Sequence, residues 1–411
     1  MNAFAAHAVQ PHPHDAAADG GQDDAPQPEH PPRDALAAAR EVVPLAAAQA
    51  DRVDREAAFP EAAFAALRER GLLGAMVPAE LGGGGASLDT IAAICRVLGG
   101  ACAATGMIYA MHQIQVACLV AHARGSIWHE RLLARIAADQ LLLASATSEQ
   151  STGGALRTSG CAVATDGGRF HLVKMAPTIS YGAQADVILA TARRHAEAPQ
   201  SDQVLVCVLD GDCTLQCTSG WDTLGMRGTC SNGFRLEARG ACEQIVPAPF
   251  GEIADATMTP VSHLLWSALW TGIAADAVQR AKTFFQGQAR ARPGTLPPSA
   301  TRLAEAAAMI DTMEARVQMA LAHYRQHTPG RSVSADFAFA AEMNGLKTSV
   351  STLALEAVQT ALLICGMAGY KHGTPFSVGR HLRDLWSAPL MISNDRILTN
   401  TASLLLAERS H

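Results

Sequence analysis

The stretch WDTLGMRGTCS at residues 221–231 decides how the rest of the chain is divided. Gly225 and Gly228 flank Arg227, and glycines at such spacing favour a loop over a regular element. Strand-like sequence lies on both sides of this loop, whereas the two ends of the chain have the period of helices. Arg227 has two open roles here: it faces an anionic group of a ligand, or it pairs with an acid of the protein.

Apolar runs around the loop predict β-strands at residues 170–172, 187–189, 204–209 and 234–236. Gly167-Gly168 and residues 210–212 predict turns between strands. The pattern divides the chain into a disordered tail at 1–31, an N-terminal helical domain at 32–143, a central β domain at 144–251 and a C-terminal helical bundle at 252–411.

Helix signals support the outer two domains. Pro60 is predicted to open a helix that ends at Gly71, and Ser87 to cap the next one. In the C-terminal part an apolar stripe runs at helical spacing. Its members are Leu303, Ile310, Met313, Val317, Leu321 and Tyr324.

Bulk composition excludes several classes of function. The 411 residues are 49% hydrophobic and carry a net charge of -6, which argues against nucleic acid as the main partner. No apolar run approaches the roughly 20 residues that a membrane span needs. The ten cysteines lack the spacing of a metal site, and the N-terminus has no signal-peptide core. We therefore expect a cytoplasmic protein that holds no metal.

Other blocks accompany the central stretch in a fixed order. They are ATSEQSTGG at 146–154, TISYGAQAD at 178–186, RARPG at 290–294, CGMAGY at 365–370 and the pair Arg383-Asp384 followed by Ile397. Together these blocks resemble the acyl-CoA dehydrogenase family of flavoproteins, from about residue 35 to the C-terminus. The segment at 221–231 is the most specific match.

This resemblance implies an α+β fold in which the β domain is barrel-like and the C-terminal domain is a four-helix bundle. It also implies FAD bound at a subunit interface of a homo-oligomer, a tetramer as in the family. The residues at the family's FAD-contact positions are Thr147, Ser148, Gly153, Gly154, Thr178, Ser180, Arg290, Gly366, Met367 and Asn394. Some depart from the family pattern: Gly154 replaces a serine, Thr178 an aromatic residue and Met367 a glycine, and Pro293 stands where a stacking Phe is usual.

Ile392 falls on the position of the family's catalytic Glu, because Arg383-Asp384 and Ile397 are both in register. A carboxylate can abstract a proton next to a thioester carbonyl, and an isoleucine cannot. A few relatives place the base at the position of Leu265, which is not an acid either.

Candidates for a substitute base are therefore His112 and Asp395. His112 lies on a helix that approaches the active-site cavity in relatives, and Asp395 is close to Ile392 in sequence. Packing or solvent contact is the alternative role for each. Tyr181, Arg227 and Ile392 are candidate substrate-binding residues.

Three functions remain open. The first is α,β-desaturation of an acyl thioester of CoA or a carrier protein by an FAD-dependent oxidoreductase in specialised metabolism, with an acceptor flavoprotein or oxygen taking the electrons. The second is a flavin-dependent monooxygenase on the same fold, which needs no base for an α-proton. The third is a non-catalytic member of the family that acts as a binding partner.

Overall fold

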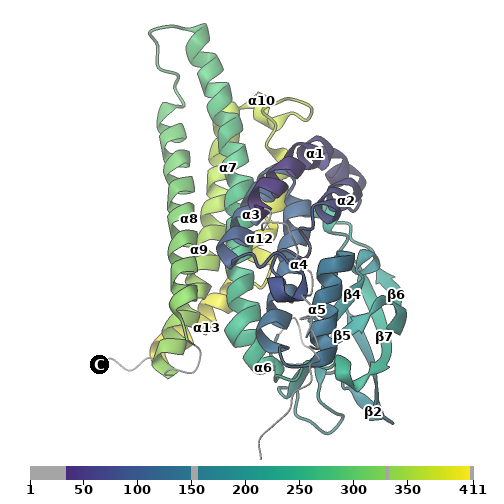
Figure 1. Ribbon diagram of the computed structural model, residues 1–411. Coiled ribbons are helices and arrows are strands. Elements are labelled where there is room, and N and C mark those ends of the chain that lie inside the picture. The colour runs from purple at the N-terminus through teal and green to yellow at the C-terminus, as the bar shows by residue number, and fades with distance from the viewer. Residues whose placement is uncertain (1–33, 150–155, 329–332, 408–411) are drawn as a thin grey trace, which may run out of the picture. The chain divides into compact units, whose positions relative to one another are not determined.

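The computed structural model describes residues 34–149, 156–328 and 333–407 (Figure 1). The tail predicted at residues 1–31 lies outside the described residues. The N-terminal part is helical. Its helices are α1 (Ala35–Glu56), α2 (Glu61–Glu69), α3 (Leu88–Ala101), α4 (Ala103–His122) and α5 (Ile127–Asp139).

Local sequence sets several of these helix ends. Asp34 accepts hydrogen bonds from the first backbone N–H groups of α1. As predicted, the Ser87 hydroxyl caps α3 by accepting from the N–H of Thr90 at 3.2 Å. Gly71 follows α2 with φ +72, a conformation that glycine adopts at little cost.

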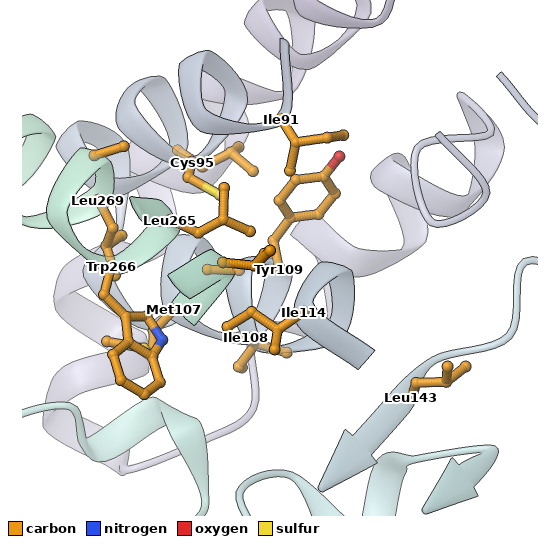
Figure 2. Close-up of a cluster of buried hydrophobic side chains, with 14 of the residues drawn as sticks. Ile91, Cys95, Met107, Ile108, Tyr109, Ile114, Leu143, Leu265, Trp266 and Leu269 are labelled. Atoms are coloured by element: carbon orange, nitrogen blue, oxygen red, sulfur yellow. The ribbon is translucent and has the colours of Figure 1, made fainter. Parts of the chain in front are cut away.

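Helix α4 is buried on nearly all sides and packs against α3, α7 and β1. Figure 2 shows the apolar core that these elements share, with Ile91 and Cys95 from α3, Met107, Ile108 and Tyr109 from α4, and Leu265, Trp266 and Leu269 from α7. Close approach of α7 to α3 requires Gly272, because a Cβ there would lie 2.0 Å from the carbonyl oxygen of Arg96.

The central part contains two sheets. One has the order β1-β4-β5 and the other β2-β3-β7-β6. Their strands are β1 (Leu143–Ala146), β2 (Ala164–Asp166), β3 (Arg169–Ala176), β4 (Val187–Arg193), β5 (Gln203–Leu209), β6 (Cys213–Ser219) and β7 (Gly233–Ala241). β1 pairs with β4 in parallel, and the other pairs are antiparallel.

All four strand predictions fall within observed strands, in β3, β4, β5 and β7. β4 and β5 are buried along nearly their whole length, which explains their continuous apolar sequences. β1, β2 and β6 were not predicted. β1 and β2 have only four and three residues, which is too short for a clear pattern. β6 is an edge strand whose side chains are mostly exposed, so its sequence has little apolar pattern.

The C-terminal part is helical again. α6 (Phe250–Ile253) and a π-helical segment (Ala254–Met258) lead into α7 (Thr259–Ala291), and α8 (Ala300–Gln326) and α9 (Val333–Cys365) follow. These three long helices pack against one another, and α13 (Asn394–Ala407) packs against α9, which gives the expected bundle (Figure 1). Short helices α10 (Met367–Tyr370), α11 (Gly379–Leu385) and α12 (Ser387–Leu390) connect α9 to α13. The expected α+β fold class, with a β part between two helical parts, is confirmed.

In the part of the chain that the structure describes, two helical segments are long and apolar enough to cross a membrane, Ala103–His122 and Asp336–Cys365. No membrane span was predicted from the sequence, because polar residues interrupt the apolar sequence of both segments. The apolar window of Ala103–His122 is 83% buried inside the protein, and that of Asp336–Cys365 is 50% buried. A helix buried in the core of a protein is also apolar on all sides, so these two segments are only weak evidence for a membrane location.

Candidate functional site

Small hydroxyl side chains gather where β1 and β3 end. The Ser148 hydroxyl donates to the main-chain oxygen of Thr178 at 3.1 Å. Two residues further on, the Ser180 hydroxyl lies 2.8 Å from that of Ser231. Thr147, Ser148, Thr178 and Ser180 are all half-buried and so remain accessible to a ligand. These four residues are called the hydroxyl strip below.

A buried ion pair anchors the segment that carries the strip. Lys174 on β3 donates to the Glu149 carboxylate at 2.6 Å, and the two side chains are 0% and 5% exposed. Glu149 also accepts from the N–H of Gly160 at 2.7 Å. Burial alone would raise the pKa of Glu149, but the charge of Lys174 and the hydrogen bonds from Lys174, Ser159 and Gly160 together outweigh burial and lower the pKa. Glu149 is thus an ionised anchor for Ser148, and its carboxylate is already bound by the protein.

Tyr181 follows the strip, but its side chain turns into the core. It is 0% exposed, and its hydroxyl donates to the main-chain oxygen of Leu143 at 2.8 Å. Burial raises the pKa of this phenol further, so it stays protonated. The hydroxyl group of Tyr181, which was predicted to bind a substrate, is therefore already hydrogen-bonded to the backbone.

Ile392 lies in the turn between α12 and α13, with its side chain 40% exposed. Its φ is +47, a left-handed conformation that β-branched residues rarely adopt. Lys347 of α9 donates to its main-chain oxygen at 2.9 Å and to Oδ1 of Asn394 at 2.7 Å. Leu265, at the other family position for a base, is fully buried in the core of Figure 2.

Lys347 was missed by the sequence analysis. It is 0% exposed, and burial lowers its pKa to about 8. One signal was present: Lys347 is the single lysine of α9, a helix in which most residues are apolar.

His112 is fully buried on α4, and backbone groups bind both of its ring nitrogens. The N–H of Leu143 donates to Nδ1 at 3.0 Å, so Nε2 carries the proton and donates to the main-chain oxygen of Leu73 at 2.8 Å. Burial lowers the pKa of His112 to about 4. The ring joins α4 to two neighbouring segments, and it has no nitrogen left to bind a substrate.

The other predicted residues are dispersed. Asp395 is exposed at the start of α13. Arg290, Gly366 and Met367 are exposed at the surface of the chain, and Gly366 has φ +55. Gly153 and Gly154 lie outside the described residues.

Arg227 pairs with an acid, which was one of its two predicted roles. Its guanidinium donates to Asp222 at 3.0 Å and to the main-chain oxygen of Asp54 at 2.9 Å. Arg227 and Asp222 line an open hollow of about 410 Å³ together with Trp221, Cys230 and Asn232. Because the Asp222 side chain is 98% exposed, this ion pair is weak and leaves Arg227 available to another anion.

The hydroxyl strip fits the ring of a flavin, since accessible hydroxyl groups can donate to its polar edge or accept from it. The adenosine half of FAD has less support from a single chain, because the residues expected to hold it are the exposed Arg290, Gly366 and Met367. Among the described residues, no group of three or more His, Cys, Asp or Glu side chains is placed to hold a metal ion.

Known proteins resemble this chain along most of its length. A family model described as Acyl-CoA dehydrogenase, N-terminal domain, matches residues 33–140. An L-evernosamine nitrososynthase of Micromonospora sp. is 30% identical over 384 residues, 85% of this chain and 84% of its own. A dibenzothiophene monooxygenase of Rhodococcus qingshengii is 25% identical, over 63% of this chain and 65% of its own. A cyclohex-1-ene-1-carbonyl-CoA dehydrogenase of Geobacter metallireducens is 28% identical, over 49% of this chain and 52% of its own.

A solved structure agrees on the fold. That of KijD3 in complex with FMN and dTDP-3-amino-2,3,6-trideoxy-4-keto-3-methyl-D-glucose superposes with a TM-score of 0.81 at 22% identity, covering 93% of this chain and 96% of that one. The fold and the relatives define the class as a flavin-dependent oxidoreductase. The chain belongs to the acyl-CoA dehydrogenase family of flavoproteins.

Proposed function

We propose that this protein is a flavin-dependent monooxygenase that oxygenates a nitrogen or sulfur atom of a small molecule. One observation carries the proposal: Ile392 stands at the family's position for a catalytic carboxylate, with Leu265 at the alternative position. Desaturation needs a base for the α-proton, whereas oxygenation of a heteroatom does not. The nitrososynthase and monooxygenase relatives favour this activity over the desaturation first expected.

Neither Glu149 nor Asp395 is placed to take over the role of the missing base. Glu149 is held by Lys174, and Asp395 is exposed to solvent. The apolar side chain of Ile392 also disfavours a charged group beside it. The residues that remain are suited to bind and orient a ligand rather than to remove a proton from carbon.

The flavin would supply the electrons, so that one atom of O2 is added to the substrate and the other leaves as water. Thr147, Ser148, Thr178 and Ser180 would hold the ring by hydrogen bonds, and the Glu149–Lys174 pair would fix their position. Lys347 would hold the main chain at Ile392, and the apolar side chain of Ile392 would border the substrate.

We infer FMN rather than the FAD first expected. The exposed Arg290 and the substitutions Pro293 and Met367 weaken the contacts that relatives make with the adenosine half of FAD. The KijD3 structure contains FMN. Titration of the purified protein with each flavin tests this inference, and tighter binding of FAD would contradict it.

We also propose a homo-oligomer in the cytoplasm. Large apolar side chains are exposed along α9, α10, α12 and α13, namely Leu363, Met367, Tyr370, Leu390, Leu398, Leu405 and Leu406. Such a surface is typical of an interface between subunits. All ten cysteines are free, as in a reducing compartment. Light scattering should give a mass above that of the single chain, and Leu398→Glu should lower it.

An anaerobic experiment separates the candidate activities. The protein is loaded with oxidised flavin and mixed with fatty acyl-CoA, and the flavin absorbance is recorded. Monooxygenase function predicts no bleaching by thioesters, and an oxygen-dependent product once a reductase supplies reduced flavin and an amine or a thioether is added. Bleaching by the thioester alone would support desaturation. A protein that binds neither flavin would support the non-catalytic role.

A further inference from the structure

Aromatic side chains on one face of α7 carry ring nitrogens that lack hydrogen bonds. His263, Trp266 and Trp270 are 1%, 7% and 0% exposed, and their spacing of three and seven residues places them on one side of the helix. No described residue bonds to Nε2 of His263 or to Nε1 of either tryptophan. Buried polar atoms in native proteins nearly always have partners. These three residues, called the α7 aromatic face, therefore point to a ligand or water.

The three rings form a continuous wall. The ring centroids of His263 and Trp266 are 6.4 Å apart, and those of Trp266 and Trp270 are 6.3 Å apart. Apolar residues of the same core lie beside Trp266, among them Met107 and Leu269 (Figure 2). A ligand beside this wall would thus have an apolar body with a polar group that reaches one or more of the ring nitrogens.

The direction of the available hydrogen bonds defines that polar group. Nδ1 of His263 lies 3.1 Å from the main-chain oxygen of Met343, which can only accept, so Nδ1 carries the proton and Nε2 is an acceptor. The two indole N–H groups can only donate. The α7 aromatic face therefore complements a group that both donates and accepts, such as a hydroxyl or an uncharged amine.

Lys347 adds a charge beside this face. Its ammonium group lies 5.8 Å from the centre of the Trp270 ring. Burial, together with this positive charge, lowers the pKa of His263 to about 3, which keeps its ring neutral. A second cation would be disfavoured here by desolvation and by repulsion from Lys347. Because Lys347 also binds the main chain of Ile392, the face adjoins the turn where relatives carry their base.

We propose that the α7 aromatic face is a substrate subsite that binds an uncharged hydroxyl or amino group on an apolar skeleton and rejects the protonated amine. The proposal rests on the monooxygenase function, because it assigns the subsite to the substrate of that reaction. The bound hydroxyl or amine anchors the skeleton and accepts a hydrogen bond from an indole N–H, so the atom that is oxygenated lies elsewhere on the substrate.

Fragment binding tests the subsite without any catalysis. The probes are cyclohexanol, cyclohexylamine and cyclohexyltrimethylammonium, and binding to the full chain is followed by ligand-observed NMR. Trp266→Phe and Trp270→Phe keep an aromatic ring and remove only the N–H donor. Each should weaken cyclohexanol binding roughly five- to tenfold, as expected for one lost hydrogen bond. Trp128→Phe, a half-buried tryptophan on α5, is the matched control and should change nothing.

Charge selection gives a second readout. Binding of cyclohexylamine should strengthen as pH rises toward the pKa of the amine, and the permanent cation should not bind. If both tryptophan variants behave like Trp128→Phe, water alone occupies the face and the subsite is wrong. Equal binding of the cation would also overturn it. If the binding pattern is as expected but the protein has no oxygenase activity, the subsite stands and the proposed function is wrong. If the protein has oxygenase activity but the tryptophan variants do not change binding, the proposed function stands and the subsite is wrong.

Discussion

Lys347 and Ile392 are joined by a hydrogen bond of 2.9 Å from the buried ammonium group to a main-chain oxygen. Ile392 has φ +47, and a non-glycine residue in this region is disfavoured by about 1–2 kcal/mol. Lys347 therefore stabilises a turn that the local sequence opposes. Strain of this kind is typical of functional sites, where the surrounding structure holds an otherwise unfavourable conformation.

Lys347→Met should destabilise the protein by about 1–3 kcal/mol, because the main-chain oxygen of Ile392 and Oδ1 of Asn394 lose their buried donor. Urea denaturation measures the free energy of unfolding. Lys371→Met removes an exposed lysine and serves as the control, with little expected change. Equal stability of the two variants would show that the hydrogen bonds of Lys347 do not hold the turn.

Glu149→Gln should destabilise the protein by about 3–5 kcal/mol, since it leaves the charge of Lys174 buried without a counterion. Flavin affinity should fall as well, because the hydroxyl strip follows the same segment. The double variant Glu149→Gln with Lys174→Met removes both charges and should recover much of the stability. A double variant that is no more stable than Glu149→Gln would mean that the ion pair is not the anchor.

Much of the fold followed from sequence because burial leaves a pattern. β4 and β5 are continuous apolar runs, and Ser87 precedes a helical period. The family blocks likewise placed Ser148 and Thr178 in one site, and the structure brings them into hydrogen-bond contact. Edge strand β6 is exposed and left no such pattern.

The roles of individual polar side chains were harder to predict. His112 bonds to backbone groups of Leu73 and Leu143, which are distant in sequence, so only the packed fold reveals that both nitrogens are used. The same holds for Tyr181, whose hydroxyl reaches the backbone of Leu143. The backbone conformation at Ile392 could not be predicted either. The alignment placed Ile392 at the position of a catalytic residue, but nothing in the sequence indicated its positive φ.

His112 should make stability depend on pH. Burial holds its pKa near 4, whereas an unfolded histidine titrates near 6.5. As pH falls below about 6.5 the unfolded chain gains a proton that the folded chain does not, so stability is present above that pH and is lost progressively down to about 4. The loss attributable to this residue is about 3 kcal/mol. His112→Gln should lower stability at neutral pH and flatten the slope, measured by urea denaturation across this range. The exposed His195→Gln is the control, and an equal slope in both variants would contradict the assignment.

Ile392→Glu should introduce a first step toward desaturation. If Ile392 borders the flavin as its position in the family implies, the new carboxylate lies where relatives carry their base, and general-base catalysis contributes roughly 10²–10⁴-fold where geometry permits. The wild type should not reduce its flavin with fatty acyl-CoA, and the variant should do so slowly under anaerobic conditions. Ile392→Gln has the same size without the charge and should stay inactive. Thioester binding is measured separately by equilibrium dialysis, because a pocket that rejects the acyl chain would hide the gain. Flavin reduction by the wild type at a rate typical of a dehydrogenase would show that another residue supplies the base and would overturn the monooxygenase proposal.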